Sequence, residues 1–402
     1  MLRHRLKIAK PSCFCAGATV LLLAMAALCL TAPPAAGHLA ATWQTETITS
    51  AIEIGQISIA LDAADRPRLA FFDHSHFALR YAQSDGGGWQ VETVADGSAG
   101  ATAGERNSLR LMGSGDPRIS YTTIFRSTHP PFSFYIDYAS RTDAGWQASR
   151  VGSGSATALG IDPSGQPRVA YAAADGSLKY AWLDGAVWRQ ETVDPQGDLP
   201  LLNMEVAERP AIFYAGCNRL KYAGRSSAGW RVEQAEALDT TVCATPLAIA
   251  DTACPRAGYY DNASGYLRFL RRRTTGWQRE PALDARFRGS GFSLALDQTG
   301  HPHLSYSNDA NRTIDYAWYD GAGWHSEVVD TTAYGYAPTA LALGRDGQPR
   351  IAYAGGADQA LRYARRLPQA PGGSGGRSPG QTRDSTGGAG SSAYIPMLVQ
   401  DC

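Results

Sequence analysis

Apolar residues alternate with polar ones in short runs along most of this chain. One copy of the pattern begins Ser293-Leu-Ala-Leu-Asp297, passes through Leu304-Ser-Tyr306 and Ile314-Asp-Tyr316-Ala317, and ends at Trp324-His-Ser-Glu327. A period of two is typical of β-strands that bury one face, and the Gly, Asp, Ser and Pro residues between the runs favour tight turns. Since no stretch after residue 40 shows a sustained helical period, the pattern predicts an all-β fold with four strands in each copy.

Each copy also carries a proline and two aromatic residues at constant positions. The proline is expected to open the second strand, where its missing N–H is tolerated. The aromatic residues are expected to fill the space between stacked sheets, as in a β-propeller. The prolines are Pro67, Pro117, Pro167, Pro210, Pro255, Pro302 and Pro349, and the aromatic residues are Phe71, Tyr121, Tyr171, Tyr214, Tyr259, Tyr306 and Tyr353 on the second strand and Tyr81, Tyr138, Tyr180, Tyr222, Phe269, Tyr316 and Tyr363 on the third.

The two ends of the repeat array complement each other. Trp43–Ile48 matches a fourth strand that lacks its first three, and Thr339–Arg365 matches three strands that lack a fourth. The sequence therefore predicts a seven-bladed β-propeller over residues 42–366, with four antiparallel strands per blade. In this fold the N-terminal strand completes the last blade by lying beside Leu361–Ala364.

A basic residue on the third strand recurs twelve residues before a glutamate on the fourth strand in several copies. We expect these residues to be cross-strand neighbours, each pair contributing about 0.2–1 kcal/mol. The pairs are Arg80 and Glu92, Lys179 and Glu191, Lys221 and Glu233, and Arg268 and Glu280.

The segments outside the repeats indicate export. Residues 1–37 combine basic residues, an apolar stretch and small residues, and are typical of a secretory signal peptide. An uncleaved membrane anchor and a lipoprotein attached through Cys29 are the alternatives. Residues 367–392 are rich in Gly, Ser and Pro and predict a disordered linker. The short apolar tail 393–402 is expected to dock on the propeller or the cell surface, and it is too short to span a bilayer.

The 402 residues carry a formal charge of zero, which gives no general attraction to nucleic acid or to anionic membranes. Export leaves four cysteines, and the strand order predicts a disulfide between Cys217 and Cys243, with Cys254 and Cys402 unassigned. Four unpaired thiols are the alternative. No CxxC or HxxxH spacing occurs, so we expect no metal and no cofactor.

The copies share the sequence elements Ser-Leu-Ala-Leu-Asp, Gly-x-Pro, Ala-Tyr, Leu-Lys-Tyr-Ala, Asp-Gly and Trp. In these elements the chain resembles the repeats of secreted bacterial β-propeller proteins. The turns at Asp85-Gly86 and Asp320-Gly321 are loosely similar to the Asp-box of the sialidase (BNR) propellers. The resemblance implies the fold and a secreted or cell-surface bacterial location, but it transfers no catalytic residue. We expect the Asp162 and Asp297 turns and the residues His301 and His303 to be structural.

Departures from the repeat concentrate on one rim, where the second-to-third-strand turns and the blade connectors meet. A pocket there could use histidines as bases or ligands and an arginine to bind a carboxylate. Exposed tyrosines could stack on sugars or protein partners. The alternative for all of them is an ordinary solvent-exposed or packed turn. The candidates are His74, His76, Arg126 and His129 for catalysis, and Asp73, Glu105, Arg106, Tyr334 and Tyr336 for ligand binding.

Three functions are compatible with this pattern. The regular repeats and the lack of an assignable catalytic set favour a non-enzymatic exported recognition propeller that binds a glycan or an extracellular protein. The first alternative is a glycoside hydrolase or polysaccharide lyase that uses the His/Arg cluster of the first two blades. The second alternative is a surface structural or display protein that is attached through its tail.

Overall fold

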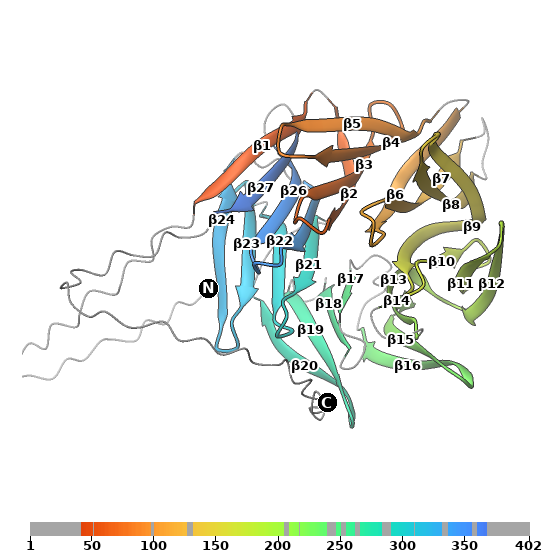
Figure 1. Ribbon diagram of the computed structural model, residues 1–402. Helices are drawn as coiled ribbons and strands as arrows, with labels where there is room; N and C mark the ends of the chain where they lie inside the picture. Colours follow the sequence, from red (N-terminus) through yellow and green to blue (C-terminus); the bar gives the residue numbers. More distant parts are fainter. Residues whose placement is uncertain are drawn as a thin grey trace, which may run out of the picture. The chain divides into compact units, whose positions relative to one another are not determined.

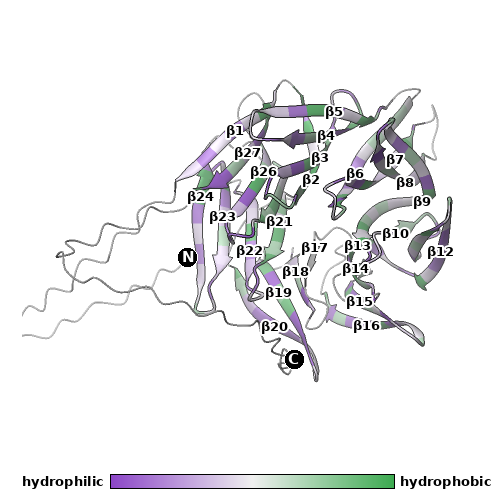
Figure 2. Ribbon diagram, viewed as in Figure 1, coloured by the Kyte–Doolittle hydropathy of each residue, from purple (hydrophilic) through white to green (hydrophobic). Residues whose placement is uncertain are grey.

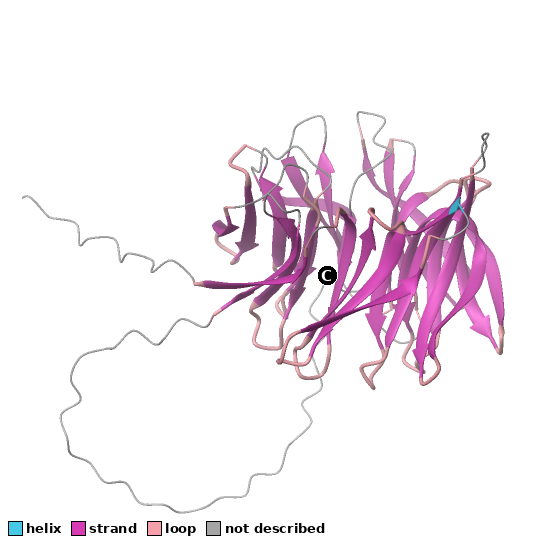
Figure 3. Ribbon diagram, turned by 90° about the horizontal axis from the view of Figure 1, so that it is seen from above, coloured by secondary structure: helices cyan, strands magenta, loops and turns pink. Residues whose placement is uncertain are grey.

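The computed structural model describes residues 42–50, 52–97, 100–126, 132–204, 209–216, 218–238, 247–250, 255–261, 266–283, 291–308, 310–331, 337–355 and 360–367. All of them belong to the unit Ala41–Cys402. Figure 3 shows that this part of the chain consists of β-strands joined by short loops.

Within each sheet, hydrogen-bonded neighbours are antiparallel and, apart from β1 beside β27, consecutive in the sequence (Figure 1). Four of these sheets are each formed by consecutive strands. They are β2 (Ile54–Leu61), β3 (Pro67–Asp73), β4 (Ala78–Ser84) and β5 (Trp89–Ala95); β13 (Asp198–Asn203), β14 (Ala211–Gly216), β15 (Arg219–Ser226) and β16 (Gly229–Ala237); β17 (Leu247–Ala250), β18 (Arg256–Asp261), β19 (Tyr266–Arg273) and β20 (Gly276–Leu283); and β21 (Phe292–Leu296), β22 (Pro302–Asn308), β23 (Thr313–Tyr319) and β24 (Trp324–Asp330).

A fifth four-stranded sheet joins the two ends of the repeat array, in the order β1-β27-β26-β25. Its strands are β1 (Trp43–Thr49), β25 (Thr339–Leu343), β26 (Pro349–Gly355) and β27 (Ala360–Arg366). Trp43 lies opposite Arg366 and Thr47 opposite Arg362. The predicted pairing of the first strand with the last is therefore confirmed, and Figure 1 shows the red β1 beside the blue β27.

The expectation of seven separate four-stranded blades is wrong. The structure has five four-stranded blades, and the strands of the second and third repeats form one seven-stranded sheet. Its strands are β6 (Ala101–Leu111), β7 (Pro117–Phe125), β8 (Ser133–Thr142), β9 (Gly145–Ile161), β10 (Pro167–Ala173), β11 (Leu178–Asp184) and β12 (Val187–Asp194).

The reason is the continuity of β9, a single strand of 17 residues that pairs with β8 through its first half and with β10 through its second. Gly152 and Gly154 lie where the two halves meet. A Cβ atom at Gly154 would lie 2.2 Å from the carbonyl oxygen of Ala172, and one at Gly152 would lie 2.5 Å from the hydroxyl of Tyr171. Glycine therefore lets the strand pass close to β10 without a break.

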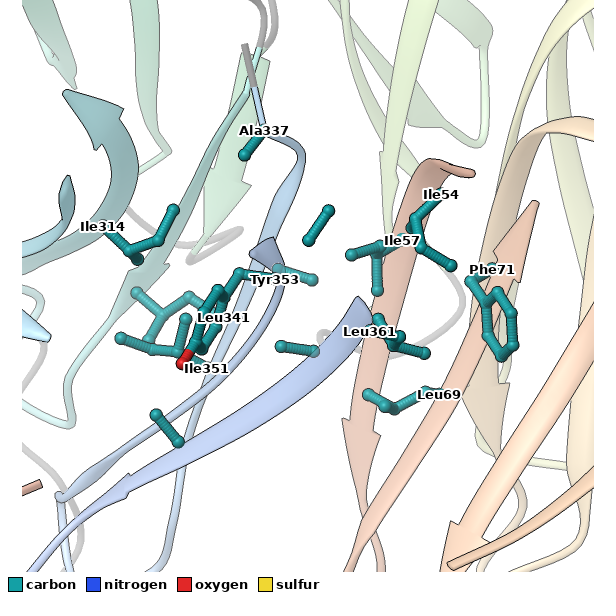
Figure 4. Close-up of a cluster of buried hydrophobic side chains, with 14 of the residues drawn as sticks. Ile54, Ile57, Leu69, Phe71, Ile314, Ala337, Leu341, Ile351, Tyr353 and Leu361 are labelled. Atoms are coloured by element: carbon teal, nitrogen blue, oxygen red, sulfur yellow. The ribbon is translucent and has the colours of Figure 1, made fainter. Parts of the chain in front are cut away.

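The predicted aromatic positions form the core. Phe71, Tyr171, Tyr214 and Tyr353 are each at most 1% exposed, and burial raises the pKa of Tyr171 to about 12. One cluster combines Ile57 and Leu69 of the first repeat with Ile351 and Leu361 of the last (Figure 4). Figure 2 shows hydrophobic and hydrophilic residues mixed along the strands, as expected when one strand face packs and the other is polar.

The inner strands of the sheets contact one another in a circular order. β2 contacts β6, which contacts β9, and the series continues through β13, β17, β21 and β25 back to β2. Serine hydroxyls link some of these neighbours. The Ser108 Oγ accepts a hydrogen bond of 3.1 Å from the Leu159 N–H, and the Ser293 Oγ accepts one of 3.0 Å from the Leu341 N–H.

The predicted pairs between third-strand bases and fourth-strand glutamates are wrong. The register of the β4–β5 hairpin places Glu92 opposite Tyr81 and places Arg80 opposite Thr93. A shift of one residue moves a side chain to the other face of the sheet. Arg80 accordingly pairs with Asp73 at 3.1 Å, as Arg268 pairs with Asp261 at 2.6 Å.

Glu92, Glu191 and Glu233 instead bind residues of the next repeat, whereas Glu280 pairs with Arg256 of its own sheet. Glu233 accepts hydrogen bonds from the Arg272 Nε at 2.6 Å and from the Trp277 indole N–H at 3.0 Å. Glu191 binds Arg225 and Trp230 in the same way. The repeated tryptophan and glutamate therefore connect neighbouring repeats, which explains why both recur along the chain.

Candidate functional site

The β3–β4 turn is organised by a buried carboxylate. Asp73 is 1% exposed and accepts hydrogen bonds from the His76 backbone N–H at 3.1 Å, from the His76 ring Nδ1 at 2.8 Å and from the Arg80 Nε at 3.1 Å. The buried charge is thus compensated by donors from its own turn. The His76 side chain is held at its base by Asp73 while 58% of it stays exposed to solvent.

His74 has a different environment from His76. Its ring packs against Phe72 with a centroid distance of 4.4 Å and an interplanar angle of 64°. It also lies over Gly55, where an added Cβ would be 3.0 Å from the His74 Nε2. His74 is therefore a partly buried packing residue in this structure.

Arg126 and Glu105 join the end of β7 to β6. Their side chains form an ion pair of 3.3 Å, and the Arg126 guanidinium carbon lies 5.6 Å from the centre of the Phe77 ring. Arg126 thus connects the β7–β8 turn with the β3–β4 turn of the neighbouring sheet. Arg106 follows Glu105 and is exposed.

The structure gives each candidate its own set of contacts. Among the described residues, no hydrogen bond or ion pair links His74, His76 and Arg126 to one another. His129, Tyr334, Tyr336, Cys217 and Cys243 lie outside the described residues. For the described part of the chain, no group of three or more His, Cys, Asp or Glu residues could hold a metal ion.

Four exposed phenylalanines on the same rim are not among the candidates predicted from the sequence. Phe77 ends the β3–β4 turn, and Phe125, Phe132 and Phe134 border the β7–β8 turn, with exposures of 46%, 40%, 47% and 36%. We call these four residues, together with Arg126 and Arg150, the aromatic rim. The register pairs Phe125 with Ser133 and Phe134 with Ile124, so these two rings lie on opposite faces of the β7–β8 hairpin. Exposed apolar rings at neighbouring turns indicate a contact surface. A signal was available in the sequence, because three of the four phenylalanines fall in the longest departure from the repeat, residues 122–135.

Arg150 on β9 completes this surface. Its guanidinium carbon lies 3.8 Å from the centre of the Tyr135 ring and 5.8 Å from that of Phe125, and its Nε pairs with Asp137 at 3.1 Å. The Phe125 and Tyr135 rings meet edge to face, 5.7 Å apart. Such cation–π and aromatic contacts restrain the rings in fixed orientations.

Phe77 has a backbone conformation that is unusual for a large side chain. Its φ is 53°, in the left-handed region. The residues at the same place in three other turns are also left-handed: Gly176 (φ 83°), Asn218 (φ 59°) and Arg312 (φ 54°). Glycine and asparagine adopt this region readily, whereas a residue with a larger side chain loses roughly 1–2 kcal/mol there.

The opposite rim is structural, as predicted. The Asp297 carboxylate accepts hydrogen bonds from the backbone N–H groups of Thr299 and His301 at 2.9 and 2.8 Å. Asp162 does the same within its own turn. Burial lowers the pKa of His303, an effect that the Asp297 carboxylate 3.6 Å away partly offsets.

The strand order and pairings define an all-β propeller. No protein-family model matches the sequence, and no curated protein matches it. Three solved structures illustrate what the chain resembles. A mutant of the NanB sialidase from Streptococcus pneumoniae has 9% identity and a TM-score of 0.46, over 79% of this chain and 70% of the other. A mutant of the Aleuria aurantia lectin in complex with Fucα1-6GlcNAc has 16% identity and a TM-score of 0.45, over 70% and 98%. A protein of unknown function from Dyadobacter fermentans has 13% identity and a TM-score of 0.48, over 80% and 97%.

No helix in the described part of the chain is long and apolar enough to cross a membrane.

Proposed function

We propose that this chain is a recognition propeller that binds a glycan through the aromatic rim. The observation that carries the proposal is the placement of the exposed phenylalanines. All four lie in or beside the second-to-third-strand turns of two adjacent repeats. The other exposed large apolar residues in the described part of the chain are Val91, Val187, Val232 and Val328 on fourth strands.

The chemistry of this rim suits a sugar. A pyranose ring presents a face of C–H groups and an edge of hydroxyls. The aromatic rim offers ring faces for the first, and guanidinium and carboxylate groups of Arg126, Glu105, Arg150 and Asp137 for the second. Such a combination of an apolar surface with a few fixed polar groups is characteristic of small-molecule and cofactor sites.

The same proposal includes the arrangement of the blades. We infer that the sheets close into a ring, in which the seven-stranded sheet takes the place of the second and third repeats. The circular order of inner-strand contacts and the β1–β27 pairing support this arrangement. Export through residues 1–37, the linker 367–392, the docking of the tail 393–402 and the Cys217–Cys243 disulfide remain predictions.

The test is binding of the full chain to an array of oligosaccharides and polysaccharides. We expect the wild type to bind a restricted set and the double variant Phe125→Ser/Phe134→Ser to bind at least tenfold more weakly. The double variant Val187→Ser/Val232→Ser is the control, since it removes exposed apolar residues elsewhere on the propeller. Absence of glycan binding by the wild type, or equal binding by both double variants, would contradict the proposal. Binding of a protein partner alone would replace the glycan by that partner.

A specific observation favours a second candidate, a glycan-active enzyme. His76 combines an exposed ring with a buried carboxylate on its Nδ1, 2.8 Å away. With Nδ1–H donating this hydrogen bond to Asp73, the Nε2 of the neutral ring is left as a base oriented by a carboxylate. Incubation of the polysaccharide bound on the array with wild type and His76→Gln, followed by analysis of reducing ends and unsaturated products, separates the two functions. Turnover that is lost in His76→Gln supports the enzyme, and stable binding without products supports recognition.

A further inference from the structure

Phe77 is a large exposed residue at a turn position where two other repeats use glycine or asparagine. Its backbone is left-handed, like that of Gly176 and Asn218 at the same place before the third strand. Glycine at this position would adopt the left-handed conformation without its energetic cost, so the turn itself does not require phenylalanine. Since its side chain also remains exposed, core packing does not explain it either. A residue kept in a sparsely populated backbone region is a reason to look for a function.

The surroundings hold Phe77 in one place. Its carbonyl oxygen accepts a hydrogen bond of 3.0 Å from the Ala103 N–H of the next sheet. Gly97 approaches so closely that an added Cβ would lie 2.5 Å from this oxygen and 2.6 Å from the Phe77 Cβ. Arg126 lies over the ring at 5.6 Å. The ring is therefore positioned before any ligand arrives, which reduces the entropy lost on binding.

Three guanidinium groups on this rim, of which Arg126 lies over the Phe77 ring, are paired with carboxylates of the protein. Arg126 is paired with Glu105, and Arg150 is paired with Asp137. On β4, directly after the turn, Arg80 is paired with the buried Asp73. A negatively charged sugar would have to compete with a carboxylate for each of these three guanidinium groups, whereas sugar hydroxyls can share them. The pairing of these three guanidinium groups with carboxylates therefore favours an uncharged ligand.

We infer that Phe77, with Arg126 above it, is a stacking position for an uncharged sugar ring. This inference rests on the proposed glycan-binding function and names the contact residue and the ligand class. It predicts that binding is insensitive to salt, because no net charge is neutralised when the ligand binds.

The test compares Phe77→Gly with Phe77→Tyr and with Gly176→Ala in the full chain. Phe77→Gly is expected to unfold at the same temperature as the wild type or a higher one, and to bind the neutral glycan at least tenfold more weakly. Phe77→Tyr keeps an aromatic ring and is expected to keep binding within threefold. Gly176→Ala introduces a side chain at the corresponding left-handed position outside the aromatic rim, and is expected to lower the melting temperature without changing affinity. Raising the salt concentration from 50 to 500 mM is expected to change the wild-type Kd less than twofold.

Several results would overturn this inference. If Phe77→Gly lowers the melting temperature, Phe77 has a structural role. If Phe77→Gly binds like the wild type while Phe125→Ser/Phe134→Ser does not, the glycan site lies elsewhere on the rim and only the proposed function stands. Preference for uronate over neutral polysaccharides, with affinity that falls as salt rises, refutes the uncharged ligand. Failure of the wild type to bind any glycan removes the proposed function itself.

Discussion

Replacing Trp43 tests whether the first strand holds the two ends of the repeat array together. Its ring meets the buried Tyr316 edge to face at 5.7 Å and packs on the cluster that contains Ile351 and Leu361. Removing a fully buried tryptophan side chain destabilises a protein by about 3–5 kcal/mol. Because Trp43 is only partly buried, we expect about 3 kcal/mol for Trp43→Ala.

This loss is measurable by calorimetry. At roughly 2 °C per kcal/mol for a chain of this size, the melting temperature should fall by about 6 °C. The release of β1 should also leave β27 with an unpaired edge, so that amide hydrogens of residues 361–366 exchange faster. Faster exchange at those residues is the specific sign of lost pairing, because general destabilisation affects all sheets.

Trp188→Ala is the matched control. Trp188 packs edge to face on Tyr138 at 5.3 Å, in the middle of the chain. The Trp188→Ala variant should lower the melting temperature by a similar amount without changing the amide hydrogen exchange of residues 361–366. A melting temperature of Trp43→Ala within 1 °C of the wild type, or unchanged exchange in β27, would refute the reasoning.

The other predictions concern one glycine and one carboxylate. Gly97→Ala should destabilise the chain by about 1–3 kcal/mol, because the new Cβ would overlap the Phe77 backbone. Gly113→Ala has open space around its Cβ and should change the thermal unfolding temperature little, so equal effects of the two would contradict this. Burial alone would raise the pKa of Glu233, but hydrogen bonds from Arg272 and Trp277 outweigh it and lower the pKa. A lowered folded-state pKa gives stability that is present above the unfolded value of roughly 4.3 and is lost as the pH falls through the folded value. Glu233→Gln should therefore lower the free energy of urea unfolding by about 1 kcal/mol at pH 7 and by less at pH 3.5, and a deficit that grows in acid would contradict the pairing.

The repeat anchors could be predicted from the sequence because each is governed by its own local chemistry. A proline is tolerated only where no ladder N–H is needed, and β3, β7, β10, β22 and β26 all begin with one. The aromatic residues four positions later are buried, as the alternating pattern requires. The pairing of β1 with β27 was predictable for a related reason, since each end of the array lacks the strands that the other supplies.

Register could not be predicted from spacing alone. The twelve-residue interval between Arg80 and Glu92 suggested neighbours, but the hairpin pairs Arg80 with Thr93 and Glu92 with Tyr81, which puts Arg80 and Glu92 on different faces. The continuity of β9 was also hidden, because its glycines suggest a turn as readily as a close approach to β10. Both depend on how two strands meet, and a linear pattern does not contain that information.

The sequence by itself determined the strand type, the repeat and the partnership of the chain ends, because these follow from residue chemistry that recurs at a constant spacing. Only the tertiary structure decided which candidates share an environment. It assigned His74 to packing on Phe72, paired His76 with Asp73, and joined Phe77 to Arg126 from the next sheet. Contacts between residues of different sheets depend on the relative position of those sheets, which long-range packing sets and local sequence does not.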